Sequence, residues 1–139
     1  MVDRNKINSK LQSLKLSLSR LNELRELSRE VFLSNFTYFD SAKYNLITAI
    51  ESMIDICNHI ISRENLEIPG TSSDSIKILV QHQVLPSDTQ NEFVSMVKFR
   101  NKAVHLYGTV DNEEVYRILQ EHLQDFDRFI SAIIKHVYE

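Results

Sequence analysis

Apolar residues recur every three or four positions along most of the chain, which is the spacing of one face of an α-helix. The first apolar stripe consists of Ile7, Leu11, Leu14, Leu18, Leu21, Leu24, Leu27 and Val31. It predicts an amphipathic helix of about eight turns. Arg25 and Ser28 stand where a strict heptad requires apolar residues, so packing in a bundle is favoured over a coiled coil.

The second stripe predicts another long helix, which we expect to run to about Ile61. Residues 35–40 interrupt the apolar pattern, and Asp40 or Ser41 is a plausible N-cap. Its expected buried face comprises Leu46, Ile47, Ile50, Met53, Ile54, Cys57, Ile60 and Ile61. Residues 63–74 contain the Pro69–Gly70 pair and predict a loop.

A short helix is expected from about Ile76 to Leu85. The pattern Ser87-x-x-Gln90 then resembles a capping box and predicts the start of a helix that ends near Gly108. A similar pattern at residues 111–114 predicts a last helix that runs almost to the C-terminus. We therefore expect a single all-α domain over residues 1–139, an up-down bundle of four long helices and one short one.

Composition supports this expectation and limits the possible environments of the protein. Only two Gly and two Pro occur in 139 residues, whereas β-sandwiches and barrels need frequent turn formers. The single cysteine, Cys57, excludes an intramolecular disulfide framework. We expect a cytoplasmic protein without membrane contact, because no apolar run approaches the roughly 18 residues of a membrane span.

The most basic stretch of the chain is residues 98–108, with Lys98, Arg100, Lys102 and His105 close together. Because the net charge is −3, any binding of nucleic acid must depend on such a local patch. Basic residues are also common at helix C-termini for electrostatic reasons alone. On an ideal helix Arg100 lies on the apolar side, where an unpaired arginine is costly unless it faces a cleft.

His105 lies well around the same ideal helix from Arg100. Both side chains reach one spot only if the helix is distorted toward Gly108 or if a second chain contributes. The sequence leaves both alternatives open. Phosphate-loop, zinc and nucleophile-elbow motifs are absent, and His59, His82, His122 and His136 have no ligand-spaced partner, so we expect no metal and no cofactor.

The stretch from Arg100 to His105 is similar to the motif of ribonucleases of the HEPN superfamily, an Arg followed after four to six residues by a His. The longer form R-N-x-x-x-H-x-Y, which ends in Tyr107, resembles the HepT-like toxin branch. Residues 49–59 and 84–86 and the capped helix after the motif extend this resemblance over nearly the whole chain from about Leu11.

The resemblance implies a HEPN-like all-α homodimer whose two motifs face a cleft between subunits, and it leaves open a higher oligomer. It implies metal-independent RNA cleavage with Arg100 and His105 as catalytic residues. It also implies a toxin–antitoxin pair with an MntA-type nucleotidyltransferase, which adenylylates Tyr107. Asn101 and Lys102, which lie between Arg100 and His105, are possible cleft-lining or supporting residues.

Glu51 and Asp55 lie one turn apart on the second long helix. Without a nearby third ligand they make a poor metal site. Two interpretations of Glu51 and Asp55 remain. They form a solvated or salt-bridged stripe beside the core, or they orient Arg100 or line the cleft.

Two other classes of function stay open. The chain could be a non-catalytic helical module that binds nucleotide or RNA through the same motif. It could also be a structural bundle whose first helix docks a partner. Cleavage that depends on His105 without metal distinguishes the ribonuclease from both.

Overall fold

The structure, a computed structural model, describes residues 2–105 and 110–139. Within them every regular element is a helix, in the order α1 (Arg4–Arg25), α2 (Arg29–Ser34), α3 (Phe36–Arg63), α4 (Ser72–Gln81), a 3-10 turn η1 (Ser87–Thr89), α5 (Gln90–His105), α6 (Asn112–Glu121) and α7 (Leu123–Tyr138). The all-α prediction is confirmed. No helix in these two ranges is both long enough and apolar enough to cross a membrane.

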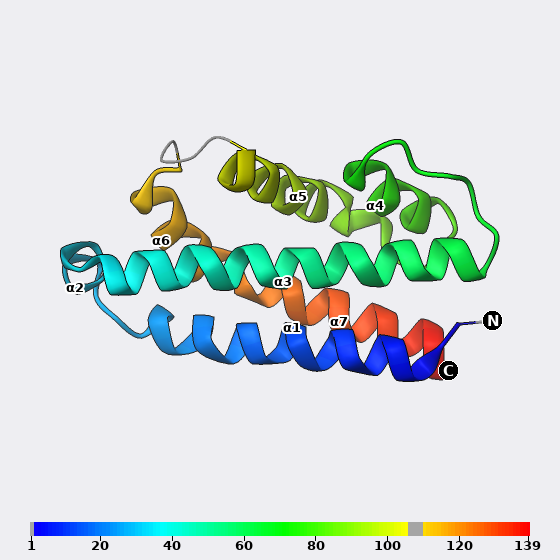
Figure 1. The fold of residues 1–139 in the computed structure, drawn as a ribbon, viewed down its shortest axis with the longest axis horizontal. Coiled ribbons are helices and arrows are strands. Elements are labelled where there is room, and N and C mark those ends of the chain that lie inside the picture. The colour runs from blue at the N-terminus through cyan, green and yellow to red at the C-terminus, as the bar shows by residue number, and fades with distance from the viewer. Residues whose placement is uncertain (1, 106–109) are drawn as a thin grey trace.

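The four longest helices, α1, α3, α5 and α7, run alternately in opposite directions (Figure 1). The 28-residue α3 lies in the middle, with α1 along one side and α4 and α5 along the other. Both termini lie at the end of the bundle where α3 finishes. This is the predicted up-down arrangement.

Buried apolar side chains from all seven α-helices form one core cluster. Phe93 of α5 meets Phe129 of α7 edge to face, with ring centroids 5.6 Å apart. Such aromatic pairs contribute roughly 0.5–1.5 kcal/mol beyond the area that they bury. Phe32 of α2 packs on Tyr116 of α6 with the two rings tilted by 47° and their centroids 5.4 Å apart. The contact between Phe93 and Phe129 anchors α5, which carries the basic motif, to the C-terminal helix α7.

The first predicted helix is wrong at its C-terminal end, because the chain breaks between α1 and α2. Ser28 adopts an extended conformation, and its hydroxyl accepts a hydrogen bond from the backbone N–H of Val31. It is thus an N-cap inside the expected helix. Val31 is exposed, although it continues the apolar stripe.

The predicted start of the second long helix is also wrong. Asn35, not Asp40 or Ser41, is the N-cap of α3, and its side chain accepts from the N–H of Thr37. The apolar periodicity did not reveal the start of α3, because the first turn of this helix faces solvent and Phe36 is 65 % exposed.

The part of the chain that the structure describes contains three shorter α-helices, α2, α4 and α6, rather than one, since both the first and the last predicted helices are divided. His122, at φ −124° and ψ 2°, ends α6 and precedes α7. The predicted short helix begins earlier than expected, because Thr71 and Asp74 form a reciprocal capping box at the start of α4. No such box forms at Ser87, where a 3-10 turn leads into α5 instead.

Candidate functional site

Helix α5 carries the basic motif and holds Arg100 on its inner side. Val97 and Phe93, on the same face about one and two turns before it, are fully buried. Arg100 itself is half-buried, and its Nε is shielded from solvent without a hydrogen-bond partner among the described residues. A buried donor of this kind is costly unless a ligand or a second chain satisfies it.

His105 is exposed and is the last residue of α5. Because α5 is helical through His105, the two side chains project about 140° apart and lie about 7.5 Å apart along the axis. The described part of the helix therefore contains no distortion that brings the two groups together. Gly108, the other end of the expected distortion, lies outside the described residues.

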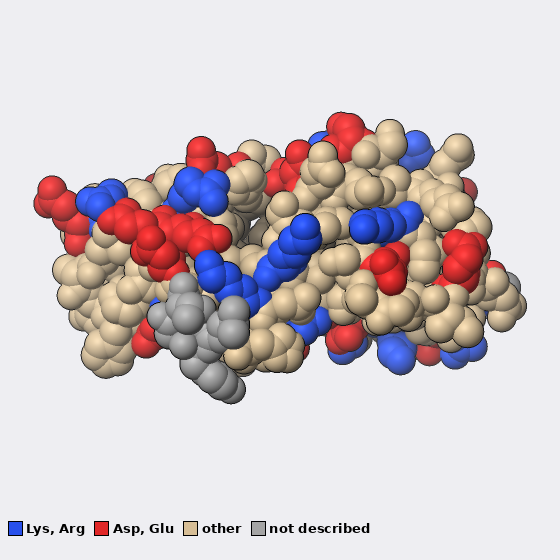
Figure 2. Space-filling view, turned by 90° about the horizontal axis from the view of Figure 1, so that it is seen from above, with Lys and Arg blue, Asp and Glu red and all other residues tan. Residues whose placement is uncertain are grey.

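Asn101 and Lys102 lie between the two motif residues and are half-buried. The Nζ of Lys102 is 3.7 Å from the carboxylate of Glu114 on α6. Figure 2 shows Lys and Arg side chains gathered over α5, with acidic side chains over the neighbouring α6. Lys102 thus lies at the boundary between a basic and an acidic area.

The carboxylates predicted on the second long helix lie on the exposed face of α3. Asp55 accepts a hydrogen bond from Lys10 of α1 at 2.9 Å, so the salt-bridged reading holds for this residue. Neither Asp55 nor Glu51 forms an ion pair with Arg100, all three being described residues. Among residues 2–105 and 110–139, no group of three or more His, Cys, Asp or Glu is arranged to hold a metal ion.

The four histidines outside the motif all have hydrogen-bond partners. His82 and His136 contact Glu67 and Glu64 at 2.7 and 2.6 Å, respectively. His122 contacts Asp125 at 3.2 Å. His59 accepts the backbone N–H of Asp3 at 3.1 Å, and burial, together with the charges of Lys6 and Arg63, lowers its pKa. Tyr107, the predicted adenylylation site, lies outside the described residues.

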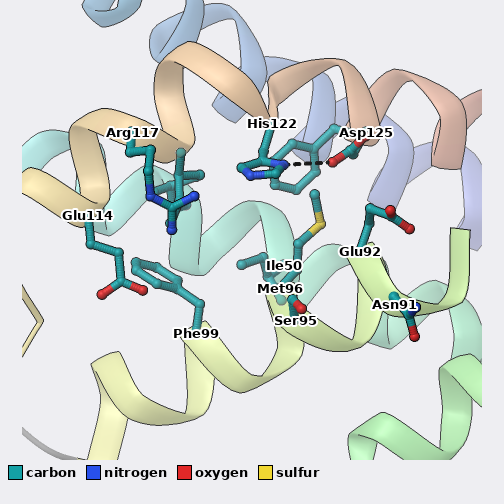
Figure 3. A pocket seen from close by; sticks show the side chains of 13 residues that line it. Ile50, Asn91, Glu92, Ser95, Met96, Phe99, Glu114, Arg117, His122 and Asp125 are labelled. Carbon is teal, nitrogen blue, oxygen red and sulfur yellow. Dashed lines mark hydrogen bonds and ion pairs between the residues drawn. The ribbon is translucent and has the colours of Figure 1, made fainter.

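A cavity of about 310 Å³ beside α5 was not expected from the sequence (Figure 3). It is lined by Glu92 and Phe99 of α5, Arg117 of α6, and His122 and Asp125 at the start of α7, among others. These residues are far apart in the sequence and match no motif. The one local signal is the i, i+3 spacing of His122 and Asp125 around the break between two helices.

The sequence matches a known family over most of the chain. A family model named Ribonuclease HepT-like matches residues 14–133. The chain belongs to the HepT-like ribonuclease family. This HepT-like chain is 34 % identical over 125 residues to the mRNA nuclease HepT of Shewanella oneidensis, covering 90 % of this chain and 93 % of the relative.

More distant relatives carry a related name. The tRNA nuclease HepT of Aphanizomenon flos-aquae is 23 % identical over 127 residues, 91 % of the HepT-like chain and 86 % of the relative. The two relatives are named for different RNA classes, so the family name alone does not define a substrate.

Solved structures agree with the HepT-like fold. The tri-AMPylated HEPN toxin of Shewanella oneidensis, in complex with its MNT antitoxin, matches with a TM-score of 0.87 and 33 % identity, covering 97 % of this chain and 99 % of that one. YutE from Bacillus subtilis, a cytosolic protein of unknown function, matches with a TM-score of 0.85 at 23 % identity, which supports the fold alone.

Proposed function

We propose that this chain is a metal-independent endoribonuclease toxin whose catalytic residues are Arg100 and His105. The observation that carries the proposal is the Nε of Arg100, buried without a partner in the described chain, on the helix that ends at an exposed imidazole. The named nuclease activity of relatives in the same family supports an RNA substrate.

The chemistry requires only the groups of the motif and the RNA itself. A ribose 2′-oxygen attacks the adjacent phosphorus, the bond from phosphorus to the 5′-oxygen breaks, and the products are a 2′,3′-cyclic phosphate and a free 5′-hydroxyl. The imidazole of His105 accepts the proton of the 2′-hydroxyl or protonates the leaving 5′-oxygen, since imidazole exchanges protons near neutral pH. General acid–base catalysis of this kind contributes roughly 10²–10⁴-fold.

The guanidinium of Arg100 stabilises the negative charge that develops on the non-bridging phosphate oxygens. Its planar fork of donors matches two of these oxygens. The loss of one such donor in other enzymes typically costs about 10²–10³-fold in rate. Lys102 and Asn101 lie next to this position and supply a further charge and a further hydrogen-bonding group.

We further propose that the active form is a homodimer in which two α5 helices face each other across a cleft. The reason is geometric, because Arg100 and His105 diverge by about 140° on one regular helix. In the proposed dimer a two-fold axis between the α5 helices brings the His105 of one chain toward the Arg100 of the other, and such an interface uses the same surface on both chains.

The partner that we propose is an MntA-type nucleotidyltransferase antitoxin, and the acceptor of AMP is Tyr107. Related toxins have been solved in complex with MntA or MNT antitoxins, and one of them is tri-AMPylated. An attached AMP brings a phosphodiester charge that pairs with Arg100 and a base that fills the space of the substrate. Inhibition then requires no change of fold.

The decisive experiment compares the wild-type protein with His105→Ala on total RNA in the presence of a chelator. The wild type should produce 2′,3′-cyclic phosphate and 5′-hydroxyl ends, and His105→Ala should produce neither. His82→Ala is the matched control, because His82 is exposed and pairs with Glu67 on another part of the bundle. RNA binding without turnover would instead identify a non-catalytic module, and a requirement for a divalent ion would contradict metal independence.

A further inference from the structure

The cavity beside α5 is separate from the Arg100 face of the helix. Its floor is apolar, formed by Leu46 and Ile50 of α3 and by Met96 and Phe126 from α5 and α7. The helices α5, α6 and α7 form its walls (Figure 3). A volume of about 310 Å³ is large enough for a planar ring system, and an apolar floor with a few polar groups is typical of ligand sites.

One end of the cavity is acidic and contains an unsatisfied acceptor. The Oε2 of Glu92 is buried and has no hydrogen-bond partner in the described chain. Glu92 lies in the first turn of α5, where a negative charge is favourable next to the helix N-terminus. The position at the helix N-terminus accounts for a negative charge at this residue. It does not account for the unpaired oxygen, because burying an acceptor without a donor costs free energy.

The neighbouring carboxylate, Asp125, is occupied in a different way. It contacts the Nδ1 of His122 at 3.2 Å, and its side chain is only 13 % exposed. Figure 3 shows Glu92 and the His122–Asp125 pair around the same end of the cavity. Glu92 therefore offers a ligand at this end a buried carboxylate oxygen that has no partner in the described chain.

The other end of the cavity presents an aromatic ring and a cation. Phe99 of α5 lies there below the guanidinium of Arg117 and next to the carboxylate of Glu114 (Figure 3). Arg117 also pairs with Glu121 at 3.4 Å, but that contact is on the surface and weak. A ligand can compete for this guanidinium.

We propose that this cavity binds a guanine base, with Glu92 accepting hydrogen bonds from the base and Arg117 donating to its opposite edge. Guanine carries two adjacent donors, the N1–H and the exocyclic amino group, which match the two oxygens of one carboxylate. Its O6 and N7 are acceptors for an arginine. Adenine and cytosine offer an amino group beside an acceptor, and uracil lacks an amino group.

The position of the cavity connects it with RNA cleavage, so this inference rests on the proposed function. Phe99 directly precedes Arg100, and Glu114 on the cavity wall lies 3.7 Å from Lys102. In this proposal the phosphates of a nucleotide whose base occupies the cavity extend past Phe99 and Glu114 toward Lys102. Recognition of single-stranded RNA commonly combines such a stacked, hydrogen-bonded base with basic groups along the backbone. The cavity would then select a guanine next to the cleaved bond.

The first experiment measures binding without cleavage. Calorimetry with GMP, AMP, CMP and UMP is carried out on full-length His105→Ala protein, which leaves the cavity unchanged. GMP should bind at least about tenfold more tightly than the others, and adding Glu92→Gln should reduce its affinity about tenfold or more, as expected for a hydrogen bond to a charged group. Glu23→Gln, an exposed carboxylate on α1, is the charge-matched control and should have no effect.

The second experiment measures cleavage of single-stranded RNA that contains one guanine, or inosine in its place. Inosine lacks only the exocyclic amino group. The wild type should cut next to guanine about tenfold faster than next to inosine, and Glu92→Gln should cut both at similar rates. Ser95→Leu, which introduces a larger side chain at the exposed rim of the cavity, should also remove the preference if Glu92→Gln does not fold.

The outcomes separate this inference from the proposed function. His105-dependent cleavage without base preference, or GMP binding that ignores Glu92→Gln, overturns the guanine site and leaves the ribonuclease intact. Glu92-dependent GMP binding by a protein that cuts no RNA supports the guanine site and overturns the ribonuclease. If GMP binds through Glu92 but RNA with guanine and RNA with inosine are cut equally fast, the cavity binds a free nucleotide. The proposal that it selects a guanine next to the cleaved bond is then overturned.

Discussion

The Nζ of Lys102 on α5 lies 3.7 Å from the carboxylate of Glu114 on α6. This ion pair connects the helix of the Arg–His motif to the next helix along the chain. Both side chains are partly exposed, at 43 % and 32 %, so solvent screens the attraction. The pair nevertheless places a negative charge beside an ammonium group that we expect to meet an RNA phosphate.

Glu114→Gln should therefore strengthen RNA binding about two- to fivefold, within the range of a surface ion pair. The measurement is fluorescence anisotropy with a uridine-only RNA in the His105→Ala background, so that neither cleavage nor the cavity contributes. The gain should shrink as salt increases from about 0.05 to 0.3 M, because exposed charges are screened. An unchanged affinity, with Glu23→Gln as the control, would show that Lys102 does not contact the substrate.

Mixing two inactive variants tests whether the active site is shared between chains. Arg100→Ala and His105→Ala should each abolish cleavage and leave the helical circular dichroism signal unchanged. Mixed in equal amounts and allowed to exchange subunits, they should recover about a quarter of the wild-type activity, because half of the dimers then contain one intact site of two. A mixture that stays inactive after verified exchange would place both residues of each site in one chain. A monomer at micromolar concentration that still cleaves RNA would exclude the shared site.

Adenylylation should map to Tyr107. Co-expression with the cognate nucleotidyltransferase should add AMP to the wild-type protein, detected by mass spectrometry of its peptides, and should inhibit RNA cleavage. Tyr107→Phe should remain unmodified and active in the same cells, because it lacks the acceptor oxygen.

Two other tyrosines provide internal controls for this assignment. The hydroxyl of Tyr116 donates to the backbone carbonyl of Leu27 at 3.4 Å, and that of Tyr138 donates to Asn8. Because both hydroxyls are already hydrogen-bonded within the bundle, we expect neither to carry AMP. AMP on Tyr116 or Tyr138, or full activity of modified protein, would contradict the regulatory role of Tyr107.

His59 should make the fold sensitive to acid. Its pKa is lowered from 6.5 by burial and by Lys6 and Arg63, despite the opposite influence of Asp3. Its Nε2 accepts the N–H of Asp3, which requires the unprotonated nitrogen. Below about pH 6.5 the unfolded chain therefore binds a proton before the folded one, and this contribution to the free energy of unfolding falls as the pH decreases. Above that pH the contribution is complete.

The measurement is the denaturation midpoint of wild-type and His59→Gln protein between pH 5 and 7.5. The wild type should lose stability more steeply toward low pH than His59→Gln, whose side-chain oxygen can still accept from Asp3. His82→Gln is the control for an exposed histidine paired with a carboxylate. Equal slopes for all three proteins would mean that protonation of His59 is not linked to folding.

Local chemistry explains where the expected helices were right and where they were wrong. The apolar stripes of α3, α5 and α7 were readable because their buried side chains follow the helical period. The breaks at Ser28 and His122 were not readable from periodicity, because a stripe can continue across a turn when both helices pack on the same core. Ser28 carries an ordinary N-cap signal, but a serine is equally common inside exposed helix faces.

The sequence by itself determined the helical class, the motif helix and the positions of Arg100 and His105, because each depends on residue spacing along one segment. The tertiary structure decided which groups meet. It paired Asp55 with Lys10, Lys102 with Glu114 and the ring of Phe93 with that of Phe129. It also closed a cavity over Glu92, whose lining comes from four helices. Contacts between segments that are distant in sequence depend on how helix faces pack, and the period of a single segment does not contain that information.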